Sequence, residues 1–325
     1  MIHAVFPGQG SQAPGMGAYL YKEFDFVRHL FEEASDALSQ NMKKLLLDGD
    51  EKELALTENT QPALLLCSSS TFLAAKKLFD LQIHMGSGHS IGEWAALVAA
   101  GAIEFSDAIK AVRERGKAMQ SAVPVGAGGM IAAMGLTPEQ VKALCIWAAT
   151  EHPEGGVLEP ANFNAPGQIV LSGHKKQCDW LIANTKKEVF ENLPAPHNQV
   201  RRLKFIPLKV SAPFHCSLMK PAEETMKLII DDMDFGACDF PIIQNLEAKY
   251  YDTVPEIKSA LTQQISSSVK WEDCVKSLAH SGVTEVVEFG HGKVLGGLIK
   301  KISGDLNVYP TTNLDEFRQI ETLAK

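Results

Sequence analysis

The chain has 325 residues, of which 45% are hydrophobic and 22% are charged, and its formal net charge is −8. These values are typical of a globular protein with one large domain or two smaller ones. They do not favour general nucleic-acid binding. No apolar run is long enough to span a membrane, and Met1–Pro7 lacks the basic and apolar regions of a signal peptide. We therefore expect a cytoplasmic protein.

The cysteines and histidines do not suggest a metal site. The six cysteines are scattered, with no Cys-x-x-Cys pair, and the ten histidines form no His-Glu-x-x-His cluster. Reduced thiols and no bound metal are the simplest interpretation.

The N-terminal segment predicts a short strand over His3–Phe6, followed by the glycine-rich loop Pro7–Gln12. Such a loop often brings backbone N–H groups close to a ligand. Neither a Gly-Lys-Ser/Thr nor a dinucleotide-binding pattern is present, and a tight turn at a sheet edge remains an alternative.

Two helical patterns come next. Apolar residues at helical spacing predict a helix over residues 25–56, and a second helix is expected over residues 62–79 with Pro62 in its first turn.

The segment Gly88-His89-Ser90-Ile91-Gly92 has the Gly-x-Ser-x-Gly pattern of a nucleophile elbow. An alternating strand pattern precedes it at 83–87, and an alanine-rich helix follows, closed by Gly101. Ser90 is then expected at the N-terminus of a helix, where negative charge is favoured. The motif alone fits an ordinary strand–turn–helix junction equally well.

A further helix, capped by Ser106-Asp107 and carrying Arg115, is expected to end before Pro124. Beyond Val125–Gly129 the pattern changes to strand, helix, two strands, helix and strand, which is the β-α-β-β-α-β order of a ferredoxin-like module. The expected elements are 130–136, 137–149, 157–162, 168–173, 175–188 and 200–208. We therefore expect a small subdomain at 126–205 inserted into a large α/β domain formed by residues 1–125 and 206–325.

The chain then returns to the large domain. Lys209–Cys216 leads into a helix near 219–230, and further helices and strands alternate as in a parallel sheet. The expected strands are 242–245, 284–289 and 308–309, and the expected helices are 255–266, 271–280 and 295–302.

Several separated motifs, in one order over nearly the whole chain, resemble the malonyl-CoA:acyl-carrier-protein transacylase family of fatty acid synthesis. The resemblance implies a hydrolase-like α/β core with a parallel sheet, a ferredoxin-like subdomain and an active site between them. The motifs are Phe6–Gln12, Thr60–Ala63, Gly88–Glu93, Arg115–Lys117, Asn162–Gln168, Ser211–His215, Gln264 and Glu288–Gly290.

The resemblance makes Ser90 the catalytic nucleophile and His215 its general base, because a serine hydroxyl becomes a good nucleophile only when a base takes its proton. It places Gln264 where the family orients this histidine with a backbone carbonyl. The following Ser266–Ser268 departs from the proline that the family usually has before Val269.

The resemblance also implies an oxyanion hole made by the backbone N–H groups of Gln9 and Ile91. Arg115 would bind the free carboxylate of a malonyl group, since a guanidinium suits a two-pronged contact. The remaining pocket residues that it implies are Gln61, Asn162 and His89.

The implied reaction is ping-pong transfer of malonyl from CoA to Ser90 and then to the phosphopantetheine thiol of acyl carrier protein, in fatty acid or polyketide synthesis. No bound cofactor is implied; the partners are malonyl-CoA and a transient carrier protein, and the chain is expected to be a monomer. Carrier proteins are acidic, so docking needs a local basic patch. The candidates are Lys175, Lys176, Lys186, Lys187, Arg201, Arg202 and Lys204.

Other interpretations remain open from the residues alone. A serine esterase or thioesterase would share the elbow but use a late histidine, His280 or His291, oriented by an acid. A non-catalytic carrier-binding scaffold is a second rival. Taken singly, His215 fits a structural histidine and Glu93 fits a charge in the first turn of a helix.

Overall fold

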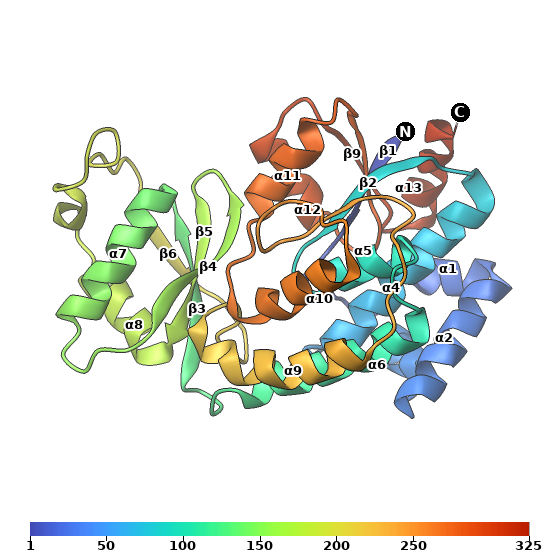
Figure 1. The fold of residues 1–325 in the computed structure, drawn as a ribbon, viewed down its shortest axis with the longest axis horizontal. Coiled ribbons are helices and arrows are strands. Elements are labelled where there is room, and N and C mark those ends of the chain that lie inside the picture. The colour runs from blue at the N-terminus through green and yellow to red at the C-terminus, as the bar shows by residue number, and fades with distance from the viewer. Residues whose placement is uncertain (325) are drawn as a thin grey trace.

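Two β-sheets organise the computed structural model, which describes residues 1–324 (Figure 1). The larger sheet is parallel, with the order β7-β2-β1-β8-β9, and the smaller sheet is antiparallel, with the order β4-β5-β3-β6. The expected α/β core with a ferredoxin-like subdomain is confirmed. The domain boundaries at 126 and 205 stay a prediction.

The parallel sheet is buried on both faces, which suits the apolar run of its central strand. Ala4 and Phe6 of β1 face one core, while Val5 faces another that contains Trp271. Phe6 pairs with Gly88, so β1 and β2 end at the same edge and the loops that follow them are neighbours. The strands are β1 Ile2–Phe6, β2 Ile83–Gly88, β7 Ile242–Ile243, β8 Glu285–Glu288 and β9 Asn307–Pro310.

Helices cover both faces of this sheet, and α6 and α9 run together along one side of the molecule (Figure 1). Within residues 1–324, no helix is both long and apolar enough to cross a membrane. The helices are α1 Ala18–Glu23, α2 Asp25–Leu38, α3 Glu51–Leu54, α4 Thr57–Phe79, α5 Gly92–Ala99, α6 Phe105–Ser121, α9 Lys220–Asp232, α10 Val254–Gln263, α11 Trp271–Ala279, α12 Val294–Ile302 and α13 Leu314–Gln319. Short helical turns lie at Lys44–Asp48, Ser217–Met219, Gln264–Ser266 and Ile320–Leu323.

The small sheet has two differently used faces. Ile131 and Ala133 pack against α7 and α8, whereas Met130 and Ala132 on the same strand join the core of the large domain. This alternation is the period of two expected of a strand with both faces covered. The elements are β3 Gly128–Met134, α7 Pro138–Glu151, β4 Leu158–Ala165, β5 Gln168–His174, α8 Lys175–Asn184, a 3₁₀ turn at Lys187–Phe190 and β6 Lys204–Pro207.

The expected single helix over 25–56 is wrong. The helix α2 ends at Leu38 because Ser39 adopts a left-handed conformation with φ of 49°. The chain restarts with a π-helical turn, and Asp50 then caps the short α3 through its side chain.

The expected position of Pro62 in a first turn is also wrong, because α4 begins five residues earlier at Thr57. A proline inside a helix leaves the carbonyl four residues before it without its usual donor. Here that carbonyl belongs to Glu58, and Arg113 donates to it at 2.9 Å. Similarly, α6 begins at Phe105 rather than after a Ser106-Asp107 cap, and no side chain caps it.

Candidate active site

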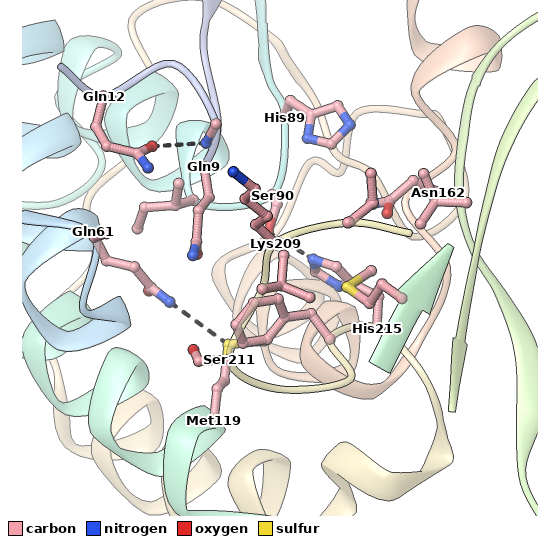
Figure 2. A pocket seen from close by; sticks show the side chains of 18 of the residues that line it. Gln9, Gln12, Gln61, His89, Ser90, Met119, Asn162, Lys209, Ser211 and His215 are labelled. Atoms are coloured by element: carbon pink, nitrogen blue, oxygen red, sulfur yellow. Dashed lines mark hydrogen bonds between the residues drawn. The ribbon is translucent and has the colours of Figure 1, made fainter. Parts of the chain in front are cut away.

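A cavity of about 360 Å³ lies where the large domain meets the small sheet (Figure 2). The loops after β1 and β2 supply Gln9 and Ser90, and the small sheet supplies Met130 and Val170. The site is therefore assembled from both sheets. Other residues that line it are Gln61, His89, Ile91, Arg115, Met119, Asn162, Asn164, Phe214 and His215.

Ser90 sits in a strained, sharply turned segment between β2 and α5. Its φ is 53°, a left-handed conformation that non-glycine residues rarely adopt. A side chain at Gly88 would meet the backbone of Gly92 at 2.0 Å, and one at Gly92 would meet the carbonyl oxygen of Phe6 at 2.1 Å. Only glycine fits at both positions, as a nucleophile elbow requires.

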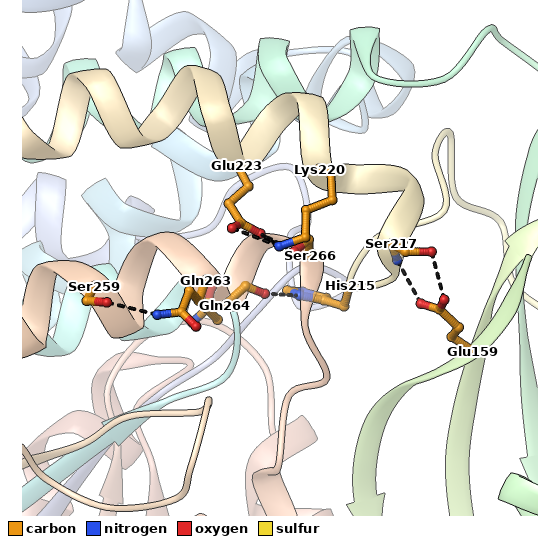
Figure 3. Close-up of polar contacts among 9 residues, drawn as sticks. All are labelled: Glu159, His215, Ser217, Lys220, Glu223, Ser259, Gln263, Gln264 and Ser266. Atoms are coloured by element: carbon orange, nitrogen blue, oxygen red, sulfur yellow. Dashed lines mark hydrogen bonds and ion pairs between the residues drawn. The ribbon is translucent and has the colours of Figure 1, made fainter.

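His215 connects the serine to Gln264. Its Nε2 lies 2.7 Å from Ser90 Oγ, and its Nδ1 lies 2.9 Å from the main-chain oxygen of Gln264 (Figures 2 and 3). Since a carbonyl oxygen can only accept, Nδ1 carries the proton and Nε2 is free to accept from the serine hydroxyl. His215 also has a positive φ, of 60°.

The surroundings keep His215 neutral. Burial, and then the positive charge of Arg115, lower the pKa of His215 to about 3. The ring therefore holds its Nε2 lone pair over the whole physiological pH range, which is the form that a general base needs.

Two residues that line the cavity have backbone amides without a hydrogen-bond partner among residues 1–324. Gln9 follows β1 and Ile91 follows Ser90; both line the cavity, and neither N–H donates a hydrogen bond within the described chain. The N–H of Ser90, in contrast, donates to Asn245 Oδ1 at 2.8 Å. Free amides beside a nucleophile are suited to stabilising a developing oxyanion.

Arg115 lies on α6, lines the cavity and is only 1% exposed. Its guanidinium donates to Gln61 Oε1 at 2.8 Å, to Gln264 Oε1 at 3.0 Å and to Ser90 Oγ at 3.2 Å. Its Nε has no partner, and no described carboxylate forms a salt bridge with it. Burial lowers its pKa, but only to about 10, so it stays charged. A buried cation with neutral partners is a site for an anion.

The remaining pocket candidates also line the cavity, beside Ser90. His89 Nε2 lies 2.8 Å from Asn164 Oδ1, and its ring lies 5.7 Å from that of Trp271. Burial lowers the pKa of His89, so it is a neutral hydrogen-bonding group. Asn162 lies on β4, and Gln61 contacts Met119 at 3.7 Å as well as Arg115.

The loop after Gln264 lacks the proline that the family usually has before Val269, and hydrogen bonds to β4 hold it instead. Val269 donates to Ala161 O at 2.8 Å and accepts from Phe163 N at 2.9 Å, so it pairs with β4. Ser268 donates from its hydroxyl to Pro160 O at 2.5 Å. The sheet-like pairing therefore holds the main chain that presents Gln264 O to His215.

Two functional neighbours were not recognised from the sequence. Asn245 touches the elbow itself, and Glu93 is completely buried rather than serving only the first turn of α5. Glu93 accepts from Asn245 N at 2.7 Å and from Gln244 Nε2 at 2.9 Å. Burial raises the pKa of Glu93. No local pattern signals these contacts, since the partners are some 150 residues apart.

The histidines of the esterase alternative lie elsewhere, because neither His280 nor His291 lines the cavity. Among residues 1–324, His215 has no acid partner either, since its Nδ1 faces a carbonyl oxygen. The geometry therefore does not favour a Ser-His-acid triad.

The sequence profile of the acyl transferase domain family matches residues 4–300. A relative from Bacillus subtilis (strain 168), named malonyl CoA-acyl carrier protein transacylase, is 42% identical over 100% of this chain and 98% of its own length. The chain belongs to the malonyl CoA-acyl carrier protein transacylase family. A family member from Haemophilus influenzae is 39% identical over 98% of this chain and 97% of its own.

Solved transacylase structures agree in fold over the full length. An acyl carrier protein S-malonyltransferase from Vibrio cholerae has a TM-score of 0.89 at 37% identity, covering 98% of this chain and 99% of its own. A malonyl-transacylase in complex with its type II PKS acyl-carrier protein has the same TM-score at 35% identity, covering 99% of each chain. The expected family, fold and acyltransferase class are confirmed.

Proposed function

We propose that this acyltransferase moves a malonyl group from CoA to the phosphopantetheine thiol of acyl carrier protein through a malonyl ester of Ser90. The observation that carries the proposal is the convergence of two groups on one oxygen. His215 Nε2 lies 2.7 Å from Ser90 Oγ, and Arg115 lies 3.2 Å from the same atom. One group activates the nucleophile, and the other is a cation that matches the carboxylate of malonyl.

In the first half-reaction, Ser90 Oγ attacks the thioester carbonyl while His215 Nε2 takes its proton. The amides of Gln9 and Ile91 donate to the oxygen that becomes negative. The intermediate collapses with loss of the CoA thiolate, and the histidinium returns its proton to that leaving group. The imidazolium that forms is stabilised by the carbonyl of Gln264.

In the second half-reaction, the thiol of the carrier's phosphopantetheine attacks the seryl ester, and His215 again removes the proton. The Ser90 oxygen leaves and regains a proton from the same ring. Both half-reactions use one set of groups, so no bound cofactor is needed. Arg115, Gln61, Asn162 and His89 surround the acyl group throughout.

Intact mass measurement after incubation with malonyl-CoA tests the covalent step. Wild-type protein is expected to gain one malonyl group, which peptide mapping places on Ser90, and to lose it when carrier protein is added. Ser90→Ala is expected to gain none. Full loading of Ser90→Ala, or release of free malonate as the main product, would exclude the proposed transfer.

The carrier protein is expected to dock on the basic face of the small subdomain. Lys175 and Lys176 form ion pairs with Asp179 and Glu154, which weakens them as candidates. The other five are exposed and form no salt bridge with another described residue; they are Lys186, Lys187, Arg201, Arg202 and Lys204. The solved complex of a related malonyl-transacylase with its acyl-carrier protein supports such a partner.

Charge reversal tests this docking surface. Arg202→Glu combined with Lys204→Glu is expected to raise the KM for carrier protein and leave the KM for malonyl-CoA unchanged. Lys22→Glu on α1 is the matched control elsewhere on the surface, because Lys22 is also exposed and forms no salt bridge with another described residue. An unchanged KM for carrier protein would show that these residues do not form the docking surface. We further propose that the protein is cytoplasmic and a monomer. Sedimentation equilibrium checks the second point, since a monomer gives the mass of one chain.

A further inference from the structure

Asn245 follows β7 and holds the Ser90 turn from two sides. Its Oδ1 accepts from the N–H of Ser90 at 2.8 Å, and its Nδ2 donates to the carbonyl oxygen of Gly88 at 2.8 Å. A single side-chain amide thus bonds both to the last residue of β2 and to the nucleophile, across His89. The side chain is fully buried, so water does not replace these bonds.

The contact with Asn245 stabilises the left-handed backbone conformation of Ser90, which a serine does not favour by itself. A non-glycine residue with φ of 53° is strained, and this conformation persists only where its surroundings fix it. The bonds of Asn245 to Gly88 O and to the Ser90 N–H provide such a constraint on the N-terminal side of Ser90.

Asn245 is itself held rigidly. Glu93 accepts from its backbone N–H at 2.7 Å, and Gln264 Nε2 lies 3.2 Å from both Asn245 Oδ1 and Ser90 O. Because Gln264 O also orients His215, the nucleophile and its base share one support. The charged and titratable groups that face Asn245 are Glu93 on α5, Cys274 on α11 at 3.8 Å and, through Gln264, Arg115 on α6.

We infer that Asn245 is a positioning residue for acyl transfer: it fixes the Ser90 turn and engages the Ser90 amide, leaving the amides of Gln9 and Ile91 to face the oxyanion. The inference rests on the proposed nucleophilic role of Ser90. Asn245 touches neither substrate nor the reacting oxygen, so its effect passes through the backbone of the elbow.

An amide is the group that suits both bonds at neutral pH, since one atom must accept and the other must donate. A carboxylate in its place would accept from Ser90 N–H but repel Gly88 O. A protonated carboxyl has the same shape as the amide and restores the donor. Burial next to Glu93 favours that protonated form.

The test is the pH profile of Asn245→Asp, measured as the rate of malonyl loading by rapid quench and intact mass. At about pH 8 the rate is expected to fall about 10²-fold, with the KM for malonyl-CoA unchanged, as a misplaced reacting group predicts. The rate is expected to recover as the pH falls towards about 5. Asn245→Ala is expected to lose a similar factor without recovery.

Asn59→Asp is the matched control. Asn59 is a buried amide that also bonds on two sides, donating to Glu53 O at 2.8 Å and accepting from Arg113, but it does not touch the elbow. Its profile is expected to follow wild type. The folded fraction of each variant is read by circular dichroism at each pH.

A flat Asn245→Asp profile, a rate above half of wild type at pH 8, or a recovery that only follows the folded fraction would overturn the inference. Mass mapping of wild-type protein distinguishes a failure of the Asn245 role from a failure of the proposed Ser90 nucleophile. Loading of Ser90 in wild type with a flat Asn245→Asp profile rejects only the role of Asn245. Absence of wild-type loading rejects the nucleophile assignment, and this inference with it.

Discussion

Arg115 is a buried charge whose described partners are all neutral, and its Nε is unpaired. A malonyl carboxylate can pair directly with this cation, whereas an acetyl group brings no charge to it. Hydrogen bonds to a charged group contribute about 1.5–3 kcal/mol, so Arg115→Ala is expected to lower kcat/KM for malonyl-CoA about 10–100-fold. The preference for malonyl over acetyl loading is expected to fall by a similar factor.

Loading with malonyl-CoA and acetyl-CoA in parallel, followed by intact mass, measures this preference. Arg113→Ala is the matched control on the same helix, because Arg113 bonds to Glu58 O and Asn59 instead of the cavity. Equal losses for both acyl groups in Arg115→Ala would show that the arginine supports the fold rather than the carboxylate.

The pH behaviour of His215 follows from its burial. A pKa lowered from 6.5 to about 3 means that the ring is already neutral at about pH 5. The kcat/KM for malonyl loading is therefore expected to stay level from about pH 8 to pH 5, without the decline near 6.5 of an exposed histidine. A decline with a midpoint near 6.5 would contradict this.

The lowered pKa of His215 makes the stability of the fold depend on pH, although it leaves the activity level. Below pH 6.5 the unfolded chain binds a proton at His215 that the folded protein does not bind until about pH 3. The contribution of this residue to stability is present above pH 6.5 and is lost as the pH falls towards 3. Urea unfolding of wild type and His215→Gln at several pH values isolates it.

Among single residues, the sequence predicts those whose neighbours in the chain form a recognisable motif. Ser90 stands between two obligatory glycines, and His215 and Arg115 stand in motifs of the family. Asn245 lacks such a signal, because its contact is with Ser90, 155 positions away in the chain. Long-range polar pairing of this kind has no local pattern.

At the scale of elements, the strand–turn–helix junction depends on close backbone packing. A methyl group at Gly92 would meet the backbone at Phe6 O at 2.1 Å and at Pro7 O at 2.9 Å, so the backbone would have to shift. Gly92→Ala is therefore expected to lower the free energy of unfolding by about 3 kcal/mol. Gly297→Ala in α12 is the matched control, since its new methyl group meets nothing within 4 Å.

Gly297→Ala is expected to raise the free energy of unfolding by about 0.5–1 kcal/mol, because alanine restricts the unfolded chain and favours a helix. Chemical denaturation of both variants gives the comparison. Similar small effects at the two positions would show that the elbow relaxes around a side chain.

Element boundaries were the least predictable part of the fold. The start of α4 was misplaced because Pro62 suggested a first turn, yet Arg113 from α6 donates to the carbonyl that the proline leaves without a donor. The capping box at Thr137 and Gln140, in contrast, is entirely local, and the start of α7 was predicted correctly. Boundaries that depend on tertiary partners are not encoded in a short window.

At the scale of the whole molecule, the cavity exists because two sheets meet, and the contacts between them position the base. Glu159 on β4 accepts from both the N–H and the hydroxyl of Ser217, each at 2.7 Å (Figure 3). Ser217 is two residues from His215, whose φ of 60° needs external support. The small sheet thereby holds the loop that carries the base.

Glu159→Ala removes both bonds and is expected to lower kcat several-fold, with little change in the KM for malonyl-CoA, because the base is displaced while the acyl pocket is kept. Glu159→Gln is the matched control, since its amide can accept from the N–H and donate to the hydroxyl of Ser217. It is expected to retain most activity. Steady-state kinetics of both variants decides the matter: an Ala variant as active as the Gln variant would mean that the large domain alone positions His215.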